Sequence, residues 1–259
     1  DGAGVEPRFH TYAELQHQAN RLSGALASLR VGKGDRVAIV MPQRFETAVA
    51  YMAVLQLGAV AVPLSQLFGP EALEFRLRDS DAVVAICDDS TIMNLLEARN
   101  TCEALRHVIG VGDSSSGDVG GGAAAMADLD YAAILAGQPA EYAPVVTRAE
   151  DPAVLIYTSG TTGAPKGVVV SHGASMALLM QVNLMFPTQP GDRFMVVTPI
   201  FHVSGLVSSF FCVYAGGSIY IPRGFDPVEA VRALSEERIT GTTMVPAMIQ
   251  ACLAVPGAA

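Results

Sequence analysis

Helical and strand patterns alternate along nearly the whole chain, and this alternation limits the fold more than any other feature. Apolar residues recur every three or four positions over residues 12–29, as on one face of a helix. Thr11 and Glu14 form the capping-box pattern that begins many helices. Apolar runs at residues 36–41 and 59–62 resemble short strands between further helical segments. Such alternation predicts an α/β fold with parallel-rich sheets flanked by helices.

The segment at residues 137–152 resembles a linker and divides these signals into two groups. We therefore expect two similar lobes, approximately 1–145 and 146–259, with an exchange of strands between them left open. Residues 112–127 are rich in glycine, serine and alanine and contain no lysine or arginine. This composition favours a flexible surface excursion over a second phosphate-binding loop.

The composition favours a compact globule and excludes several functional classes. Hydrophobic residues make up 51% of the 259 residues and charged residues only 16%, which argues against disorder. The net charge of −9 argues against a nucleic-acid partner, which is usually bound by a basic face. Stretches 47–64 and 203–221 are strongly apolar but interrupted by glycine. Each is expected to form a buried helix followed by a strand, with no membrane span.

The N-terminus and the cysteines predict a cytoplasmic protein. No basic segment followed by an apolar run, as in a secretory leader, begins the sequence. The four cysteines lack the close spacing of zinc ligands or of a disulfide framework. We therefore expect reduced, buried thiols at Cys87, Cys102, Cys212 and Cys252.

The most specific chemical pattern is the loop sequence YTSGTTGAPKG, from Tyr157 to Gly167. Its glycines allow backbone amides to approach a ligand closely, while its hydroxyl groups and Lys166 add further donors. Such a concave group of donors suits a polyphosphate. A Walker A loop is excluded, because that motif requires serine or threonine after its lysine and Gly167 stands there. The alternative is an ordinary hairpin loop between two buried strands.

This string resembles the phosphate-binding signature of the adenylate-forming superfamily, which includes acyl-CoA synthetases, peptide-synthetase adenylation domains and luciferases. Residues 11–22, 57–64 and 199–205 resemble further blocks of that family, in the same order. The resemblance implies that a carboxylate attacks the α-phosphorus of ATP, giving an acyl-adenylate and pyrophosphate. The thiol of coenzyme A then displaces AMP to form a thioester. Mg²⁺ is expected to bridge phosphate oxygens.

The resemblance also implies roles for individual residues. It assigns the β- and γ-phosphate cradle to Thr158, Ser159, Gly160, Thr161, Thr162, Gly163 and Lys166. His202 is expected to shape the acyl pocket or to gate the second substrate, and Met248 to line that pocket. Core packing is an equally good interpretation of Met248, and His172 is interpreted as mainly structural.

Other family motifs are not found in the sequence. By the resemblance, the Mg²⁺-binding glutamate and a C-terminal domain with the catalytic lysine would follow Ala259. We therefore expect residues 1–259 to be an incomplete N-terminal AMP-binding domain, inactive in adenylation on its own. Its expected substrate is a fatty or other organic acid. The alternatives are a domain that loads an acid onto a carrier-protein thiol and a non-catalytic nucleotide-binding remnant.

Overall fold

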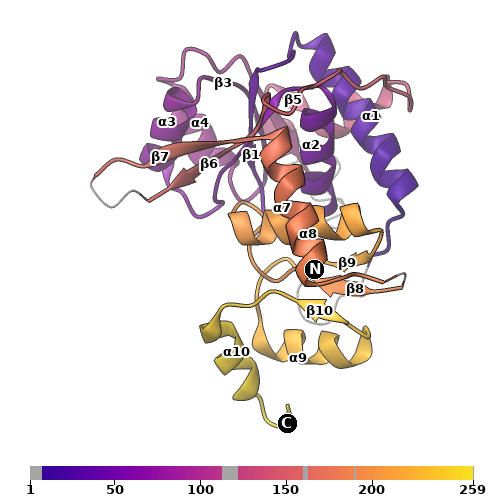
Figure 1. Cartoon of the computed structure of the whole chain (residues 1–259). Coiled ribbons are helices and arrows are strands. Elements are labelled where there is room, and N and C mark those ends of the chain that lie inside the picture. The colour runs from indigo at the N-terminus through magenta and orange to yellow at the C-terminus, as the bar shows by residue number, and fades with distance from the viewer. Residues whose placement is uncertain (1–7, 113–121, 160–162, 190, 259) are drawn as a thin grey trace. The chain divides into compact units, whose positions relative to one another are not determined.

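The chain folds into two compact units (Figure 1). A computed structural model describes residues 8–112, 122–159, 163–189 and 191–258. The larger unit comprises His10–Met41 and Phe45–Ser175, and the smaller unit comprises Pro42–Arg44 and Met176–Ala259 with the N-terminal segment. The contacts therefore place a border between Ser175 and Met176, whereas the sequence suggested an approximate division at 145/146. Strands β6 and β7, which follow residue 145, pair within the sheet of the larger unit.

Seven strands in the described part of the larger unit form one sheet, in the order β5-β4-β3-β1-β2-β6-β7. All neighbouring strands are parallel except β6 and β7, which are antiparallel. At the centre, Ala38 of β1 lies between Val62 of β2 and Ala85 of β3. The predicted α/β class with parallel-rich sheets is confirmed. The strands are β1 (Arg36–Val40), β2 (Val60–Pro63), β3 (Ala82–Asp88), β4 (His107–Val111), β5 (Leu129–Asp130), β6 (Pro152–Thr158) and β7 (Lys166–Ser171).

Helices cover both faces of this sheet (Figure 1). Val40 of β1 belongs to a buried cluster that includes Leu73 of α3 and Leu95 of α4. Val37 and Ile39 alternate with it along the strand and therefore face the opposite side, and both are buried. The helices are α1 (Tyr12–Ser28), α2 (Phe45–Gln56), α3 (Pro70–Asp79), α4 (Ile92–Arg99), α5 (Gly122–Met126) and α6 (Tyr131–Ala136).

Two local predictions have different outcomes. The capping box is confirmed: the Thr11 amide donates to Glu14 Oε2 at 2.6 Å, and the Glu14 amide donates to Thr11 Oγ1 at 3.1 Å. The predicted surface excursion is wrong for its last part, because α5 packs closely against the sheet. Ala123 is fully buried, and a Cβ built at Gly110 would lie 2.0 Å from its carbonyl oxygen. Residues 113–121 lie outside the described residues.

The smaller unit has its own parallel sheet, in the order β10-β8-β9. Its strands are β8 (Arg193–Met195), β9 (Ser218–Tyr220) and β10 (Gly241–Thr242), and its helices are α8 (Val203–Ala215), α9 (Pro227–Glu236) and α10 (Pro246–Leu253). Met195 and Val197 pack with Ala230 and Ala233 of α9 and Cys252 of α10. In the described residues, each unit thus has a parallel-rich sheet with helices, of three strands in the smaller unit and seven in the larger.

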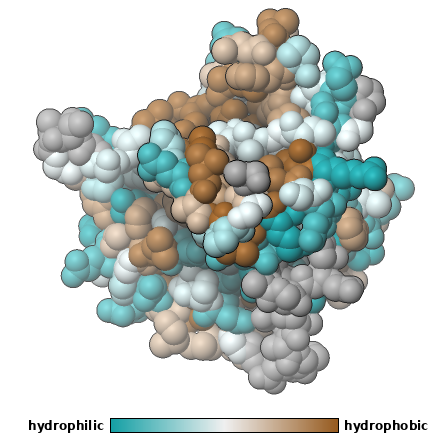
Figure 2. Space-filling view, turned by 90° about the horizontal axis from the view of Figure 1, so that it is seen from below, coloured by the Kyte–Doolittle hydropathy of each residue, from teal (hydrophilic) through white to brown (hydrophobic). Residues whose placement is uncertain are grey.

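Both strongly apolar stretches form a helix, a glycine turn and a strand, as predicted. Gly58 (φ 69°) separates α2 from β2, and Gly216 (φ 73°) ends α8 before β9. Helix α7 (His172–Met185) begins in the larger unit and continues into the smaller one. It exposes Met180 and Leu184. Figure 2 shows apolar areas among polar ones on the face of the molecule that is seen there. Within the described ranges, no helix combines the length and apolar character needed to cross a membrane.

Candidate functional site

The described signature residues lie at the end of β6, at the start of β7 and next to these strand ends (Figure 1). Thr158, the last residue of β6, pairs with Lys166, the first residue of β7. The Thr158 hydroxyl donates to the Lys166 carbonyl oxygen at 3.5 Å. Ser159, Gly163 and the Lys166 side chain are exposed, so their polar groups are open to a ligand. Gly160, Thr161 and Thr162 lie outside the described residues.

The alternative interpretation of this segment is an ordinary hairpin loop between two buried strands, but the second strand of the hairpin is exposed. Val168 and Val169 of β7 are 47% and 60% exposed, so the loop does not join two buried strands. Gly163 has φ 136°, a conformation that side-chain-bearing residues rarely adopt. A glycine at this position is therefore required by the path of the loop.

Tyr157 fixes the end of β6 to α3. Its hydroxyl donates to Asp79 Oδ2 at 2.7 Å and lies 3.2 Å from the carbonyl oxygen of Arg76. Burial raises the pKa of the Tyr157 hydroxyl, and the hydrogen bond and negative charge of Asp79 raise it further. The phenol therefore remains a protonated donor, because Asp79 accepts its proton in a hydrogen bond.

Gly167 lies opposite Tyr157 in the hairpin. A Cβ built at Gly167 would lie 3.0 Å from Leu155 Cδ1 and 3.5 Å from the Tyr157 ring. The absence of a side chain therefore allows the Tyr157 ring and Leu155 to cover this backbone. The first and last residues of the signature thus support each other across the two strands.

Sequence reasoning missed Arg76 and Asp79, the α3 residues that contact Tyr157. Arg76 lies between Leu73 and Leu77 on the buried face of α3. A charged residue within the apolar stripe of a predicted helix was the available signal, because arginine is rarely buried without a partner.

His202 and Met248 occupy different environments in the smaller unit. His202 is the N-cap of α8: its Nδ1 accepts a hydrogen bond from the Ser204 amide at 3.3 Å, and its ring is exposed. Met248 is half-buried and packs against the cluster that contains Met195 and Cys252. The structure therefore gives each residue a packing or capping contact, without bringing the two together through any described contact.

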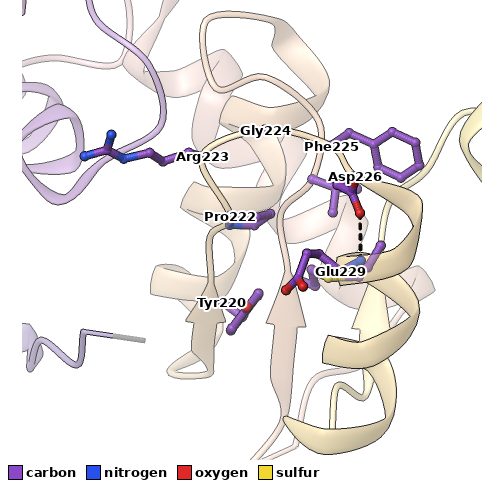
Figure 3. Close-up of a pocket in the computed structure, with 10 residues that line it drawn as sticks. Tyr220, Pro222, Arg223, Gly224, Phe225, Asp226 and Glu229 are labelled. Carbon is purple, nitrogen blue, oxygen red and sulfur yellow. Dashed lines mark hydrogen bonds between the residues drawn. The ribbon is translucent and has the colours of Figure 1, made fainter. Parts of the chain in front are cut away.

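A cavity of about 230 Å³ lies beside α9 in the smaller unit. Figure 3 shows Tyr220, Phe225 and Glu229 around it, with the Asp226 carboxylate accepting a hydrogen bond from the Glu229 amide at 2.9 Å. Neither His202 nor Met248 is among the residues that line this cavity. The cavity is therefore separate from the two residues predicted to border an acyl pocket.

No metal centre is formed by the described residues. Among them, no group of three or more histidine, cysteine, aspartate or glutamate side chains is placed to hold a metal ion. All four cysteines are buried, as predicted. The donors that the site offers are hydroxyls, backbone amides and the Lys166 ammonium, a set suited to an anion.

Comparison with known proteins identifies the family. The family described as AMP-binding enzyme matches residues 4–259. The long-chain-fatty-acid–CoA ligase FadD13 of Mycobacterium tuberculosis is 29% identical over 259 residues, which cover 98% of this chain and 48% of that protein. The chain thus spans about half the length of this curated relative.

Two solved structures agree with this match. The inhibitor-bound N-terminal domain of FACL13 from Mycobacterium tuberculosis has a TM-score of 0.84 and 29% identity, over 95% of this chain and 58% of that one. ATP-bound MatB from Rhodopseudomonas palustris has a TM-score of 0.81 and 27% identity, over 95% of this chain and 46% of that one. The fold is that of the N-terminal domain of adenylate-forming enzymes, and the chain belongs to the AMP-binding enzyme family.

Proposed function

We propose that the protein containing this chain activates a carboxylic acid with ATP and then transfers the acyl group to coenzyme A. The observation that carries this proposal is the complete signature sequence, in which Thr158 and Lys166 are exposed and lie opposite each other at paired positions of β6 and β7. The similarity to a protein named as a CoA ligase supports coenzyme A as acceptor. The similarity to the ATP-bound structure of MatB supports ATP as the nucleotide.

The chemistry requires donors where negative charge develops. In the first half-reaction a carboxylate oxygen bonds to the α-phosphorus of ATP, and the bond from that phosphorus to the bridging oxygen breaks. Pyrophosphate leaves with that electron pair. We assign the stabilisation of the β- and γ-phosphates to Thr158, Ser159, Gly160, Thr161, Thr162, Gly163 and Lys166. Each well-placed donor of this type lowers the barrier by roughly 3 kcal/mol.

Lys166 has a particular role in this assignment. The chain carries a net charge of −9, so ATP meets an unfavourable overall field and needs a local cation. Lys166 is one of two lysines in the sequence, and it is exposed at the loop end of the hairpin. Pyrophosphate has already left when the second half-reaction begins, in which the thiol sulfur attacks the acyl carbon and AMP leaves. The role of Lys166 therefore belongs to the first half-reaction.

Mg²⁺ is expected to accompany ATP, but the described residues do not fit a protein site for it. They form no group of carboxylates or histidines suited to a metal ion. No step of the reaction is therefore assigned to the metal. The residues at the hairpin tip fit the phosphate groups instead, because every polar side chain there can donate a hydrogen bond.

We further propose that His202 and Met248 border the acyl pocket, that the acid is a fatty or other organic acid, and that the protein acts in the cytoplasm. An exposed His202 ring held by Ser204 supports a fixed orientation at the mouth of such a pocket. The similarity to FadD13, which is named as a long-chain-fatty-acid–CoA ligase, supports a fatty acid.

The test is ATP–pyrophosphate exchange by the natural full-length protein with a panel of carboxylic acids, with and without Lys166→Ala. We expect exchange with at least one acid and a decrease of about 10²–10³-fold in the variant, as for loss of one transition-state donor. Lys33→Ala is the matched control, because Lys33 instead forms an ion pair with Asp151 at 2.5 Å. Exchange by Lys166→Ala at the wild-type rate would contradict the assignment.

Assays of the same full-length protein distinguish the CoA ligase from the two alternative functions. Thioester formation with coenzyme A supports the proposal, whereas transfer only to a phosphopantetheinylated carrier protein supports the loading domain. ATP binding without exchange for any acid supports the non-catalytic remnant.

A further inference from the structure

A buried arginine lies directly behind the signature hairpin. Arg76 is only 8% exposed, although arginine is rarely buried unless it is paired. In the part of the chain that the structure describes, no carboxylate forms an ion pair with it, and its Nε has no hydrogen-bond partner. Such a group is unfavourable for stability by itself, so another interaction must account for it.

That interaction is provided by two aromatic rings. The Arg76 guanidinium carbon lies 4.0 Å from the centroid of the Phe68 ring and 5.6 Å from that of the Tyr157 ring. A cation at these distances is attracted by the ring faces. Nη1 also donates to the Ala72 carbonyl oxygen at 2.6 Å. Burial lowers the pKa of Arg76, yet an arginine remains charged in proteins.

Tyr157 transmits this contact to the phosphate-binding segment. Its ring contacts Arg76, and its hydroxyl donates to Asp79, so both ends of the side chain are held by α3. Side chains alternate along a strand. Tyr157 therefore faces α3, whereas Thr158 faces the opposite side, where its hydroxyl meets the Lys166 carbonyl oxygen.

On the basis of the function proposed above, we propose that Arg76 is a positioning residue. Held between Phe68 and Tyr157, it fixes the end of β6 so that Thr158, Ser159 and Lys166 are already arranged when ATP arrives. Arg76 does not contact the nucleotide in this role. It lowers the conformational freedom that the segment would otherwise lose on binding.

The test uses Arg76→Met, Arg76→Lys and Arg78→Met in the natural full-length protein. Methionine keeps an unbranched side chain and removes the cation, whereas lysine keeps the charge. Arg78 is the matched control, because it lies on the same helix with its side chain 61% exposed and pairs with Glu74. The readouts are the KM values for ATP and for the acid in pyrophosphate exchange, together with hydrogen exchange at the Thr158 and Ser159 amides.

We expect Arg76→Met to raise the KM for ATP about tenfold, the order of a desolvated cation–π contact. The KM for the acid should stay unchanged. The Thr158 and Ser159 amides should exchange faster, Arg76→Lys should restore part of both effects, and Arg78→Met should resemble the wild type. Equal increases in both KM values, or an unchanged KM for ATP, would overturn the proposal.

Hydrogen exchange separates this inference from the proposed function. If the wild type exchanges no pyrophosphate with any acid, the proposed function fails, but the amide measurement still tests Arg76. Unchanged amide exchange in a folded Arg76→Met variant would overturn the positioning role. If that variant does not fold, Phe68→Leu replaces it, since it removes the ring that lies 4.0 Å from the Arg76 guanidinium carbon and keeps both hydrogen bonds of the Tyr157 hydroxyl. It should also accelerate exchange at Thr158, and wild-type exchange there would overturn the proposal.

Discussion

In the replacement of Gly205 by alanine, helix propensity and packing have opposite effects on stability. The sign of the change in the free energy of unfolding therefore shows which effect is larger. Gly205 is buried in the first turn of α8. Helix propensity alone predicts that alanine stabilises the protein, by about 1 kcal/mol at most. The packing around Gly205 predicts the opposite result.

The structure gives the size of the packing effect. A Cβ at Gly205 would lie 2.3 Å from the Pro199 carbonyl oxygen and 2.5 Å from the Thr198 carbonyl oxygen. Both contacts are with backbone and both are closer than the 3.0 Å below which real Cβ atoms are essentially never found. The start of α8 must therefore move away from residues 198–199. Overpacking of this kind costs roughly 1–3 kcal/mol. Because both clashes are with backbone, we take the upper end of this range. After the propensity gain of at most about 1 kcal/mol, we expect a net loss of about 2 kcal/mol.

The measurement is urea unfolding of the natural full-length chain, followed by hydrogen exchange at amides of α8. Gly24→Ala in α1 is the matched control, because its new Cβ would meet only Gln138 Oε1, the end of a flexible side chain, at 2.7 Å. We expect that control to be neutral or slightly stabilising. A Gly205→Ala protein at least as stable as the wild type would refute the reasoning. It would also show that α8, and with it the His202 cap, tolerates displacement.

Two further predictions concern titratable groups. Burial lowers the pKa of His172 below its ordinary 6.5, a nearby Lys33 adds to this, and Asp151 opposes it. The folded protein therefore binds the proton less readily than the unfolded chain. The contribution of neutral His172 to the free energy of unfolding is complete above pH 6.5 and is lost as the pH falls below that value. His172→Gln should flatten the dependence of urea stability on pH below 6.5, and an unchanged slope would contradict this. Burial raises the pKa of Cys212 to about 12, so iodoacetamide at about pH 8 should modify it only after unfolding. Rapid labelling of the native protein would show that the thiol is accessible.

The elements of the fold could be predicted because their signals are local. The apolar repeat over residues 12–29 and the Thr11–Glu14 box define α1, and Pro70 in the first turn defines α3. The border between units could not be predicted in the same way. It depends on the pairing of Ala61 with Val154, a contact between distant segments that periodicity does not encode.

The same distinction applies to the site. The signature string predicted a phosphate-binding loop because its donors are contiguous in sequence. Arg76 and Asp79 were missed because they act from another element: the Tyr157–Asp79 hydrogen bond joins residues 78 positions apart. An arginine in an apolar stripe indicates an unusual environment, but only the fold shows that the environment is the back of the hairpin.

The geometry also divides the signature into two kinds of residue. Tyr157 contacts α3, and Gly167 lies opposite Tyr157 and close to its ring, so these contacts are made before any ligand binds. Thr158, Ser159 and Lys166 are exposed and make few contacts within the protein. Substitutions of the first kind should therefore alter stability and nucleotide binding together, whereas those of the second kind should alter nucleotide binding alone. A motif read as one ligand-binding string is thus better understood as a binding segment between two structural anchors.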